Sequence, residues 1–429
     1  MAYKNIPNSV SKFMEKITQK CGETHKGWAE NFNAAFANTL LTTVKRREDG
    51  TTFMLTGDIP AMWLRDSTAQ VRPYLVIAKE DEDLADMIAG LVKKQFFYIN
   101  IDPYANAFNE TPNGAGHQTD DTKMNDWIWE RKYEIDSLCY PVQLAYLLYK
   151  NTGRRDHFNQ DFIAGVKKIL DVFQVEQDHN QSPYTFMRDT NRPEDTLINE
   201  GRGAEVVPTG MTWSGFRPSD DACKYGYLVP SNMFAVVILG YIEEIFSKVF
   251  DEQIIVADAR KLKNEIEAGI EKYGRTTNEA GEDVYAYEVD GRGNASLMDD
   301  SNVPNLISAP YLGYGTIHDE RYLRTRNTLL SKENPYYYEG KYAKGIGSSH
   351  TPENYVWPIA LAMEGMTTDK KSEKERILNL LVENDAGTHL MHEGFDVDNP
   401  NNYTREWFSW ANMMFCELVM DYFDVRVEK

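Results

Sequence analysis

The sequence predicts an all-α fold in which paired helices close into a single toroid. Three observations support this prediction: helical spacing of apolar residues recurs along nearly the whole chain, strand-like segments are few and short, and no linker or shift of composition divides the chain. We therefore expect residues 1–429 to form one domain, with the long loops gathered at one end of the toroid. The alternative is a multi-domain helical protein or an α-solenoid, although no consensus repeats with the roughly 34–47-residue period of a solenoid.

Helices are expected wherever apolar residues recur at positions i, i+3 and i+4. The segments with this spacing are Ser9–Lys20, Gly27–Val44, Ser67–Ala78, Asp81–Ile99, Ile135–Lys150, Asp161–Gln174, Ser231–Phe250, Asp258–Lys272, Val303–Leu312, Arg321–Leu330, Pro352–Glu364, Lys371–Glu383 and Arg405–Phe423. Capping signals support two of the helix starts: Asp66 or Ser67 for one, and Pro230-Ser231 for another.

Strands are expected only as short β-hairpin decorations in the connections. The segments that alternate weakly are Thr51–Thr56, Tyr184–Arg188 and Asp283–Val289. Most of the Trp, Asp-Asp and Gly-rich segments fall in three long loops, Ile101–Glu134, Phe173–Pro230 and Gly274–Asn302. Because binding and catalytic residues concentrate in long loops on a regular scaffold, we expect the functional site to be built largely from these loops.

The charge and the apolar pattern exclude two classes of partner. The formal charge of −20 argues against nucleic acid, because phosphate binding needs clustered Lys and Arg. No run approaches the ~18 apolar residues of a membrane span, and the N-terminal residues lack the apolar stretch of a signal peptide. We therefore expect a cytoplasmic protein with no membrane partner. Nothing in the sequence fixes an oligomeric state.

The cysteines and histidines do not indicate a metal site. Cys21, Cys139, Cys223 and Cys416 are scattered without a C-x-x-C pair, which indicates reduced thiols. The HLMH segment at 389–392 lacks the Glu of an HExxH motif. Neither a phosphate-binding glycine loop nor a G-x-S-x-G elbow is present. We expect no metal and no cofactor.

Several segments combine carboxylates, amides, Arg and His with Trp and Tyr. They are 57–75 (GDIPAMWLRDSTAQVRPYL), 117–121 with Trp127 and Trp129, 130–137 (ERKYEIDS), 217–224 (RPSDDACK), 299–302 (DDSN), 347–355 (GSSHTPENY) and 392–398 with 405–410. An aromatic face covers the apolar side of a sugar ring, and polar side chains bind its hydroxyl groups. Core packing with solvated acids explains any one segment, but the recurrence favours a carbohydrate site.

Carboxylates are the best candidates for catalysis at such a site. Hydrolysis of a glycosidic bond needs one carboxyl group to donate a proton and a second one to activate water or attack carbon. Asp220 or Asp221 is a candidate for the proton donor, because adjacent acids raise each other's pKa by like-charge repulsion. Glu393 is a candidate for the second group, since Gly394 lets the backbone approach a ligand. The acids Glu134, Asp136 and Asp300 would pass the same test.

The longest of these motifs resemble those of glycoside hydrolase family 125. The resemblance rests on residues 57–75, YEIDSLCYP at 133–141, RPSDDACKYGYLVPSNMF at 217–234 and HEGFDVDNPNNYTREWFSWANMMF at 392–415. It extends from about residue 10 to residue 425. The resemblance implies an (α/α)6 barrel that removes non-reducing terminal α-1,6-linked mannose with inversion and without a metal.

By the same resemblance, Asp220 is the general acid and Glu393 the general base, and the substrates are α-mannoside oligosaccharides such as N-glycan fragments. An inverting pair predicts carboxyl groups roughly 6.5–9.5 Å apart. Two alternatives remain from the residues alone: another toroid enzyme, such as a uronate lyase or a sugar epimerase, and a glycan-binding protein without turnover.

We expect the segment Trp63–Asp66 to grip the terminal mannose instead of carrying out proton transfer. Asp66 can accept from free N–H groups at a helix start and also from a hydroxyl, while Arg65 holds an oxygen and Trp63 forms a wall. The complete set of expected substrate-binding residues is Trp63, Arg65, Asp66, Gln118, Asp136, Asp300, Asn302, His350, Arg405 and Trp407.

Overall fold

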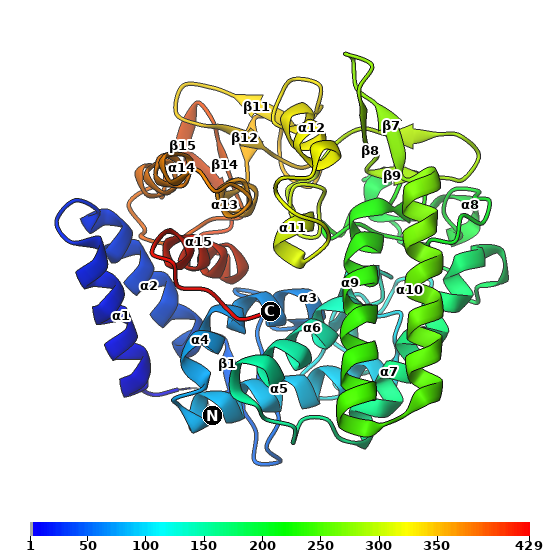
Figure 1. Cartoon of the computed structure of the whole chain (residues 1–429), viewed down its shortest axis with the longest axis horizontal. Helices are drawn as coiled ribbons and strands as arrows, with labels where there is room; N and C mark the ends of the chain where they lie inside the picture. The colour runs from blue at the N-terminus through cyan, green and yellow to red at the C-terminus, as the bar shows by residue number, and fades with distance from the viewer. Residues whose placement is uncertain (1–2) are drawn as a thin grey trace. The chain divides into compact units, whose positions relative to one another are not determined.

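The computed structural model describes residues 3–429 (Figure 1). The chain forms two compact units, and each is assembled from segments that are distant in the sequence. Unit 1 consists of Met1–Gln95, Leu144–Asn159 and Tyr338–Lys429, and unit 2 of Phe96–Gln143 and Gln160–Tyr337. Helices α5 (Glu82–Ile101) and α6 (Ile135–Thr152) and strand β11 (Tyr337–Glu339) each have residues in both units.

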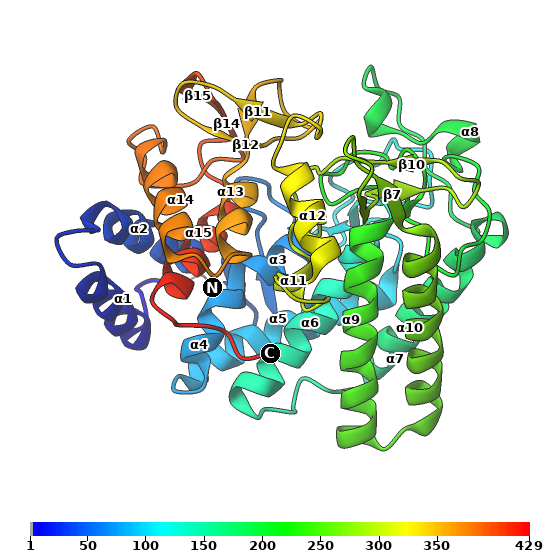
Figure 2. The ribbon, with the colours of Figure 1, turned by 45° about the horizontal axis from the view of Figure 1, so that its top comes forward.

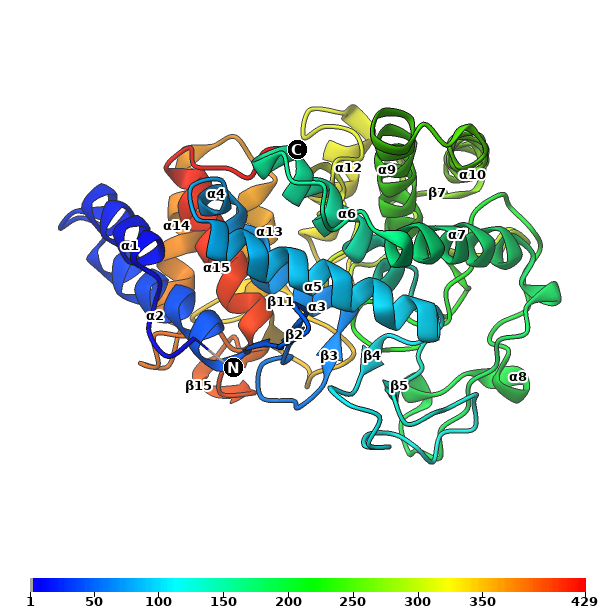
Figure 3. The same ribbon diagram turned by 90° about the horizontal axis from the view of Figure 1, so that it is seen from below.

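The core of unit 1 is built around one helix, α15. The helices of this unit are α1 (Asn8–Cys21), α2 (Lys26–Thr42), α3 (Leu64–Val71), η1 (Arg72–Tyr74), α4 (Leu75–Ala78), α13 (Pro358–Met366), α14 (Lys371–Glu383) and α15 (Ser409–Tyr422). Helix α15 packs against α2, α3, α13 and α14 (Figures 1 and 3). Its residues 409–421 are all buried, as expected of a helix that is largely apolar on every side.

Helix α3 is buried along its whole length although five of its eight residues are polar. Its hydroxyl groups find partners inside the unit: the side-chain amide of Gln95 donates to Ser67 Oγ and to Thr68 Oγ1, at 2.9 Å each. Just beyond the helix, the buried Arg72 pairs with Glu417 of α15. Buried polar groups with partners add specificity to a core, so the segment 64–72 is held in one orientation against α15.

Short strands carry the loops of unit 1. Strands β1 (Val44–Arg46) and β2 (Thr52–Met54) form an antiparallel hairpin. Strands β13 (Tyr355–Val356), β14 (Gly394–Asp396) and β15 (Asn399–Thr404) form a three-stranded antiparallel sheet with an irregularity between Phe395 and Asp396. The remaining strands of unit 1 are β3 (Met62–Trp63) and β12 (Lys344–Ile346).

Unit 2 is built on a pair of long antiparallel helices, α9 (Val229–Ile245) and α10 (Gln253–Tyr273), which lie side by side (Figures 1 and 2). Helix α10 buries one stripe, in which Val256, Ala259, Leu262 and Ile266 follow one another at intervals of three or four residues, and exposes the opposite side. The other helical elements of this unit are α7 (Gln160–Val175), η2 (Glu176–Gln181), η3 (Pro193–Asp195), α8 (Ile198–Gly201), η4 (Phe246–Phe250), α11 (Ala309–Leu312) and α12 (Glu320–Leu329).

The strands of unit 2 are equally short. Strand β9 (Glu288–Val289) lies between β6 (Tyr227–Leu228) and β10 (Ala295–Ser296), and β7 (Arg275–Thr277) pairs with β8 (Asp283–Tyr285). Strand β4 (Ala107–Phe108) pairs with β5 (Ile128–Glu130). These strands fasten the long loops that the sequence places between the helices.

Most expected helices are present, but several begin elsewhere. The helix expected at Ser67–Ala78 begins at Leu64 and is interrupted at Arg72–Tyr74, where Pro73 lacks the N–H of a regular turn. Neither Asp66 nor Ser67 is therefore its cap, since the N-cap position is Trp63.

The helices expected from Val303, Pro352 and Arg405 are shorter than the apolar pattern suggests, because they begin at Ala309, Pro358 and Ser409. The residues between are used in turns and strands. The strand expected at Tyr184–Arg188 is wrong, because this segment makes only an isolated bridge, between Met187 and Asp121.

The four cysteines are free and buried, as the sequence indicates for reduced thiols. Between residues 3 and 429, no helix combines the length and the apolar character needed to cross a bilayer.

Candidate active site

Asp220 lies at the tip of a tight hairpin in unit 2. The hairpin is closed by a bridge between Phe216 and Ala222 and by the Arg217 N–H, which donates to the Asp221 carbonyl at 2.8 Å. At the tip, Asp220 has φ 66°, in the left-handed region that only a few non-glycine residues adopt. Such conformations cluster at functional sites, where the surrounding structure has to enforce them.

The two adjacent acids of the hairpin, Asp220 and Asp221, differ in burial and in their partners. Asp221 is only 2% exposed, and its carboxylate pairs with Arg192 at 3.3 Å. Asp220 is partly exposed, and the Asn106 amide nitrogen is 3.5 Å from its Oδ1. Asp221 thus has a structural ion pair, whereas Asp220 keeps the access that proton transfer requires.

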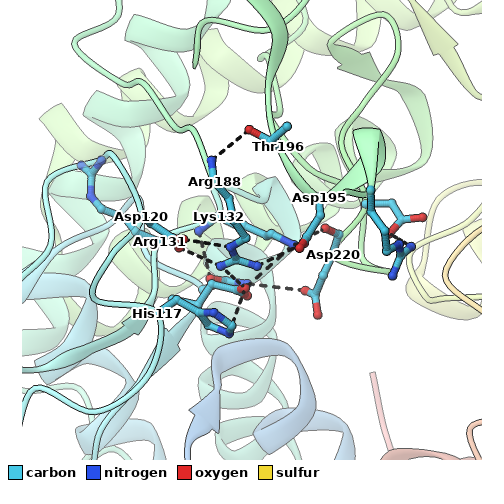
Figure 4. Close-up of polar contacts among 12 residues, drawn as sticks. His117, Asp120, Arg131, Lys132, Arg188, Asp195, Thr196 and Asp220 are labelled. Atoms are coloured by element: carbon cyan, nitrogen blue, oxygen red, sulfur yellow. Dashed lines mark hydrogen bonds and ion pairs between the residues drawn. The ribbon is translucent and has the colours of Figure 1, made fainter. Parts of the chain in front are cut away.

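Next to Asp220 lies a buried network of charges centred on Lys132 (Figure 4). The Lys132 ammonium donates to the Asp220 carbonyl at 2.7 Å and to Asp195 Oδ1 at 2.5 Å, and Glu130 Oε1 is 3.8 Å away. Burial by itself lowers the pKa of Lys132, but the negative charges of Glu130, Asp220 and Asp195 outweigh burial and raise this pKa. Lys132 therefore stays charged although its side chain is 2% exposed.

Arg188 also binds two acids of this network, Asp195 and Glu130; Figure 4 shows Arg188 beside Asp195. Its guanidinium makes a two-pronged contact with Asp120, at 2.9 and 2.7 Å, and also reaches Glu130 Oε1 at 2.8 Å and Asp195 Oδ1 at 3.1 Å. Lys132 and Arg188 lower the pKa of Asp195 against the opposing effect of its burial. These paired and hydrogen-bonded charges hold the side chains next to the hairpin in one arrangement.

A second group of polar contacts holds the other arm of the hairpin. Arg217 donates to Glu288 at 2.6 Å and lies 3.7 Å from Asp300, while the Ser219 hydroxyl donates to Asp300 at 2.7 Å. Asp300 is thus linked to the residue before Asp220. Its neighbour Asp299 is fully buried, and burial raises the pKa of Asp299 to about 7.

Three further expected binding residues lie in unit 2. The amide nitrogen of Asn302 is buried and has no hydrogen-bond partner among residues 3–429, so it is a free donor. Asp136 is fully buried in the first turn of α6. Gln118 donates to the carbonyl groups of Ala115 and Ile128, at 3.2 and 2.6 Å, and these bonds fasten its own loop.

In unit 1, Glu393 precedes strand β14, and its N–H donates to the Thr404 carbonyl at 3.2 Å. Its carboxylate is 13% exposed and lies 3.8 Å from the Arg405 guanidinium. Arg405 also pairs with Asp58, donates to the Thr56 carbonyl at 3.3 Å, and stacks over Phe408 with 4.4 Å to the ring centroid. Arg405 therefore joins the segment around Glu393 to the segment that begins at Gly57.

Gly57 allows this junction to be tight. It has φ +56°, and a Cβ at this position would lie 3.1 Å from the Arg405 guanidinium and 3.7 Å from the Trp407 ring. Only glycine combines this backbone conformation with so close an approach. Trp407, which is partly exposed, thus lies beside Arg405.

The expected grip on a sugar is also in unit 1. Trp63 is 6% exposed, and its indole N–H is buried without a partner among the described residues. Arg65 and Asp66 are buried next to each other, with 3.5 Å between Nε and Oδ2, and Arg65 lies over the Trp410 ring at 5.6 Å. A buried indole N–H without an acceptor in the protein can donate to a hydroxyl group of a ligand.

His350 is placed near Glu393 through Trp357. The His350 and Trp357 rings meet edge to face at 6.4 Å, and a Cβ on Gly394 would lie 3.3 Å from the Trp357 nitrogen. In contrast, His392 is held by two carbonyl groups and is stacked on Tyr403, so it has a structural role.

The expected residues are divided between the two units, and the Gln118 side chain fastens its own loop. Sequence reasoning did not single out Asn106, which contacts Asp220, or Arg188, which binds Asp195 and Glu130. Asp58, which pairs with Arg405, lies within the quoted segment 57–75 but was not singled out either. Lys132 lies within the quoted segment 130–137 but was not singled out, because a lone Lys gives no signal before its burial is known. In the range 3–429, no cluster of three or more His, Cys, Asp or Glu side chains could hold a metal ion.

The family model described as metal-independent α-mannosidase (GH125) matches residues 25–420. The chain belongs to glycoside hydrolase family 125. This GH125 chain is also 36% identical over 437 residues to the Meiotically up-regulated gene 157 protein of Schizosaccharomyces pombe, a match that covers 96% of this chain and 85% of that protein.

Solved structures agree with this assignment. A metal-independent α-mannosidase from Streptococcus pneumoniae, in a non-productive substrate complex with α-1,6-mannobiose, is 57% identical to this GH125 chain, with a TM-score of 0.97 and coverage of 99% of this chain and 100% of that one. A bacterial glucoamylase with bound acarbose shares the fold alone, at 12% identity and a TM-score of 0.59 over 97% of this chain and 58% of its own.

The (α/α)6 fold class and the family predicted from the sequence are therefore confirmed. This GH125 chain is a glycoside hydrolase, an α-mannosidase, and the lyase, epimerase and pure binding alternatives lose their support.

Proposed function

We propose that this α-mannosidase removes α-1,6-linked mannose from the non-reducing end of oligosaccharides, with inversion of the anomeric centre. The observation that carries the proposal is the 57% identity, over 99% of the chain, to the S. pneumoniae enzyme described with α-1,6-mannobiose. That structure is described in the context of N-linked glycan processing, so fragments of such glycans are the proposed natural substrates. The same coverage supports the two units acting as one catalytic domain.

In the proposed reaction, Asp220 is the general acid and Glu393 the general base. The Asp220 carboxyl group gives its proton to the glycosidic oxygen as the bond from this oxygen to C1 breaks. Glu393 takes a proton from a water molecule whose oxygen forms the new bond to C1 from the opposite face. The products are an alcohol and β-mannose. This division requires the two carboxyl groups to lie roughly 6.5–9.5 Å apart, which leaves room for the water.

The polar contacts of the two residues are compatible with these roles. Glu393 lies beside one cation, Arg405, at 3.8 Å, and a base has to carry negative charge. The Asp220 carboxyl group is approached by the neutral amide of Asn106, while the Lys132 ammonium binds the main-chain carbonyl of Asp220.

The binding of mannose is assigned to side chains that still have hydrogen-bonding capacity. The indole N–H of Trp63 and the amide of Asn302 are buried donors without partners among residues 3–429. A sugar hydroxyl would satisfy each of them. The full proposed binding set is Trp63, Arg65, Asp66, Gln118, Asp136, Asp300, Asn302, His350, Arg405 and Trp407, and Gln118 contributes by fastening its loop.

Incubation with α-1,2-, α-1,3- and α-1,6-mannobiose tests the linkage. We expect mannose from the α-1,6 isomer, and release from only the α-1,2 isomer would reject the linkage. Proton NMR of the first product formed tests the stereochemistry: β-mannose is expected, and α-mannose would indicate retention. Longer α-1,6-mannosides test the mode of action, since an exo enzyme releases only monosaccharide.

A further inference from the structure

Lys132 is a buried cation that the proposed chemistry does not use. Its side chain is 2% exposed, and removing an ammonium group from water is costly unless ion pairs and hydrogen bonds compensate. The ammonium binds one main-chain group, the Asp220 carbonyl, at 2.7 Å. A buried lysine that donates to the carbonyl of the proposed general acid is placed to control the orientation of that residue.

The peptide at Asp220 needs such control. With φ 66°, Asp220 is in a region that an L-residue with a side chain adopts reluctantly, and relaxation to negative φ would turn both its carbonyl and its carboxyl group. The bond from the Asp220 N–H to the Arg217 carbonyl, at 2.9 Å, holds one side of the residue. The bond from Lys132 to the Asp220 carbonyl holds the other side.

Lys132 is itself held on several sides. Asp195 Oδ1 accepts from its ammonium at 2.5 Å, and Asn106 accepts from its main-chain N–H at 3.1 Å. Arg188 binds Asp195, which Figure 4 shows beside Lys132, and also binds Glu130, whose carboxylate is 3.8 Å from the ammonium. Asn106 also has its amide nitrogen 3.5 Å from Asp220 Oδ1, so the same residue contacts both the lysine and the acid.

We propose that Lys132 is the positioning residue for Asp220: its ammonium locks the Asp220 peptide in the left-handed turn and so aims the carboxyl group at the glycosidic oxygen. The proposal rests on the proposed role of Asp220 as general acid. Proton donation is sensitive to small displacements of the donor, whereas the attack of water on the other face of C1 does not use this carboxyl group.

The test replaces Lys132 by Met, which keeps the length of the side chain and removes its donor and charge. On α-1,6-mannobiose we expect kcat to fall about 100-fold with KM changed less than about threefold, since general acid catalysis is worth ~10²–10⁴. On 2,4-dinitrophenyl α-mannoside, whose leaving group needs no proton, we expect kcat to fall less than about fivefold. Equal losses on both substrates, or no loss, would overturn the proposal.

Two companion variants separate this inference from the proposed function. Asp220→Asn should show the same dependence on the leaving group, and if it does not, the assignment of Asp220 as the acid fails. If Asp220→Asn shows the dependence and Lys132→Met does not, only the positioning role fails. Lys248→Met, which removes an exposed lysine paired with Glu244, is the matched control and should leave both rates unchanged.

A variant of Asp195 tests the positioning role of Lys132 while the lysine itself stays in place. This variant provides the test if Lys132→Met does not fold. Asp195 is 26% exposed, so Asp195→Asn leaves Lys132 and its bond to the Asp220 carbonyl in place but loosens the ammonium. We expect a loss of about tenfold on mannobiose and less than about twofold on the dinitrophenyl substrate. The same loss on both substrates would contradict the positioning role.

Discussion

The two proposed catalytic carboxylates lie in contrasting surroundings. In unit 2, Asp220 stands on a left-handed turn above a buried network in which Lys132 and Arg188 are shared among several acids. In unit 1, Glu393 lies beside a short sheet, and the cation that the structure places next to it is Arg405, at 3.8 Å. Asp220 is therefore oriented by several contacts, whereas Arg405 is the charged partner of the Glu393 carboxylate among residues 3–429.

The difference agrees with the roles that we propose for the two groups. A general acid must meet one oxygen of the substrate directly, so its direction has to be fixed. A general base of an inverting enzyme acts through a water molecule, which absorbs part of any misalignment. Because Lys132 and Arg188 share Asp195 and Glu130, we expect loss of the Arg188 contacts to be partly compensated by Lys132. Among residues 3–429, Glu393 has no second ion pair that would compensate for the loss of Arg405.

The largest effect is expected from the carboxylates themselves. Asp220→Asn and Glu393→Gln should each lower kcat on α-1,6-mannobiose by about 10³-fold or more, because each removes a proton-transfer group. Only Asp220→Asn should recover most of its rate on 2,4-dinitrophenyl α-mannoside. Steady-state kinetics on both substrates measure this.

Glu15→Gln, on the exposed surface of α1, is the matched control and should behave as wild type. If Glu393→Gln recovered on the activated substrate as well, the division between acid and base would be wrong.

The next effect compares the arginines of the two regions. Arg405→Lys should lower kcat/KM about 100-fold, since one ammonium cannot serve Asp58, the Thr56 carbonyl and Glu393 together. Arg188→Lys should cost about fivefold, because Lys132 still holds Asp195 after the two-pronged contact of Arg188 is lost. A larger loss in Arg188→Lys than in Arg405→Lys would reverse the comparison.

A smaller effect is expected from Asp66 in unit 1. Asp66→Ala should lower kcat/KM about 10- to 50-fold, mostly through KM, if its carboxylate binds a sugar hydroxyl. Asp161→Ala is the control, because Asp161 is also an acid in the first turn of a helix, α7, but is exposed. If both variants lose only thermal stability and keep kcat/KM, Asp66 is a helix-start residue and not a ligand.

The smallest effects concern stability and run in opposite directions in the two units. Burial lowers the pKa of His157 in unit 1 to about 4, so between pH 6.5 and 4 the unfolded chain takes up a proton that the folded chain refuses, and acid destabilises. Burial raises the pKa of Asp299 in unit 2 to about 7, so between pH 4 and 7 the folded chain retains a proton that the unfolded chain has lost, and rising pH destabilises.

Each group should change the free energy of unfolding by about 2 kcal/mol between pH 5 and 6.5. Urea unfolding at the two pH values measures it: relative to wild type, His157→Gln should become more stable at pH 5, and Asp299→Asn more stable at pH 6.5. Parallel pH dependence of wild type and both variants would show that neither group titrates as its burial implies.

The sequence alone predicted the helical fold class because apolar spacing survives in almost every helix, from α1 to α14. It was less reliable at helix starts. The apolar pattern runs through Arg405 into α15, but Arg405 has φ 53° and pairs with Asp58, more than 300 positions earlier in the chain. Spacing within a helix is local information, whereas such a contact is visible only after the chain has folded.

The same limit applies to the site. The residue types that bind and hydrolyse a glycoside, and the family motifs around Asp220 and Glu393, could be found in the sequence. The different environments of Asp220 and Asp221 could not, because both follow Ser219 in the same polar segment, and only the hairpin buries one against Arg192 and leaves the other accessible. The proposed role of Lys132 was hidden for the same reason. The Asp220 carbonyl and Asp195 belong to separate segments, and only the tertiary structure buries Lys132 and brings both groups to its ammonium.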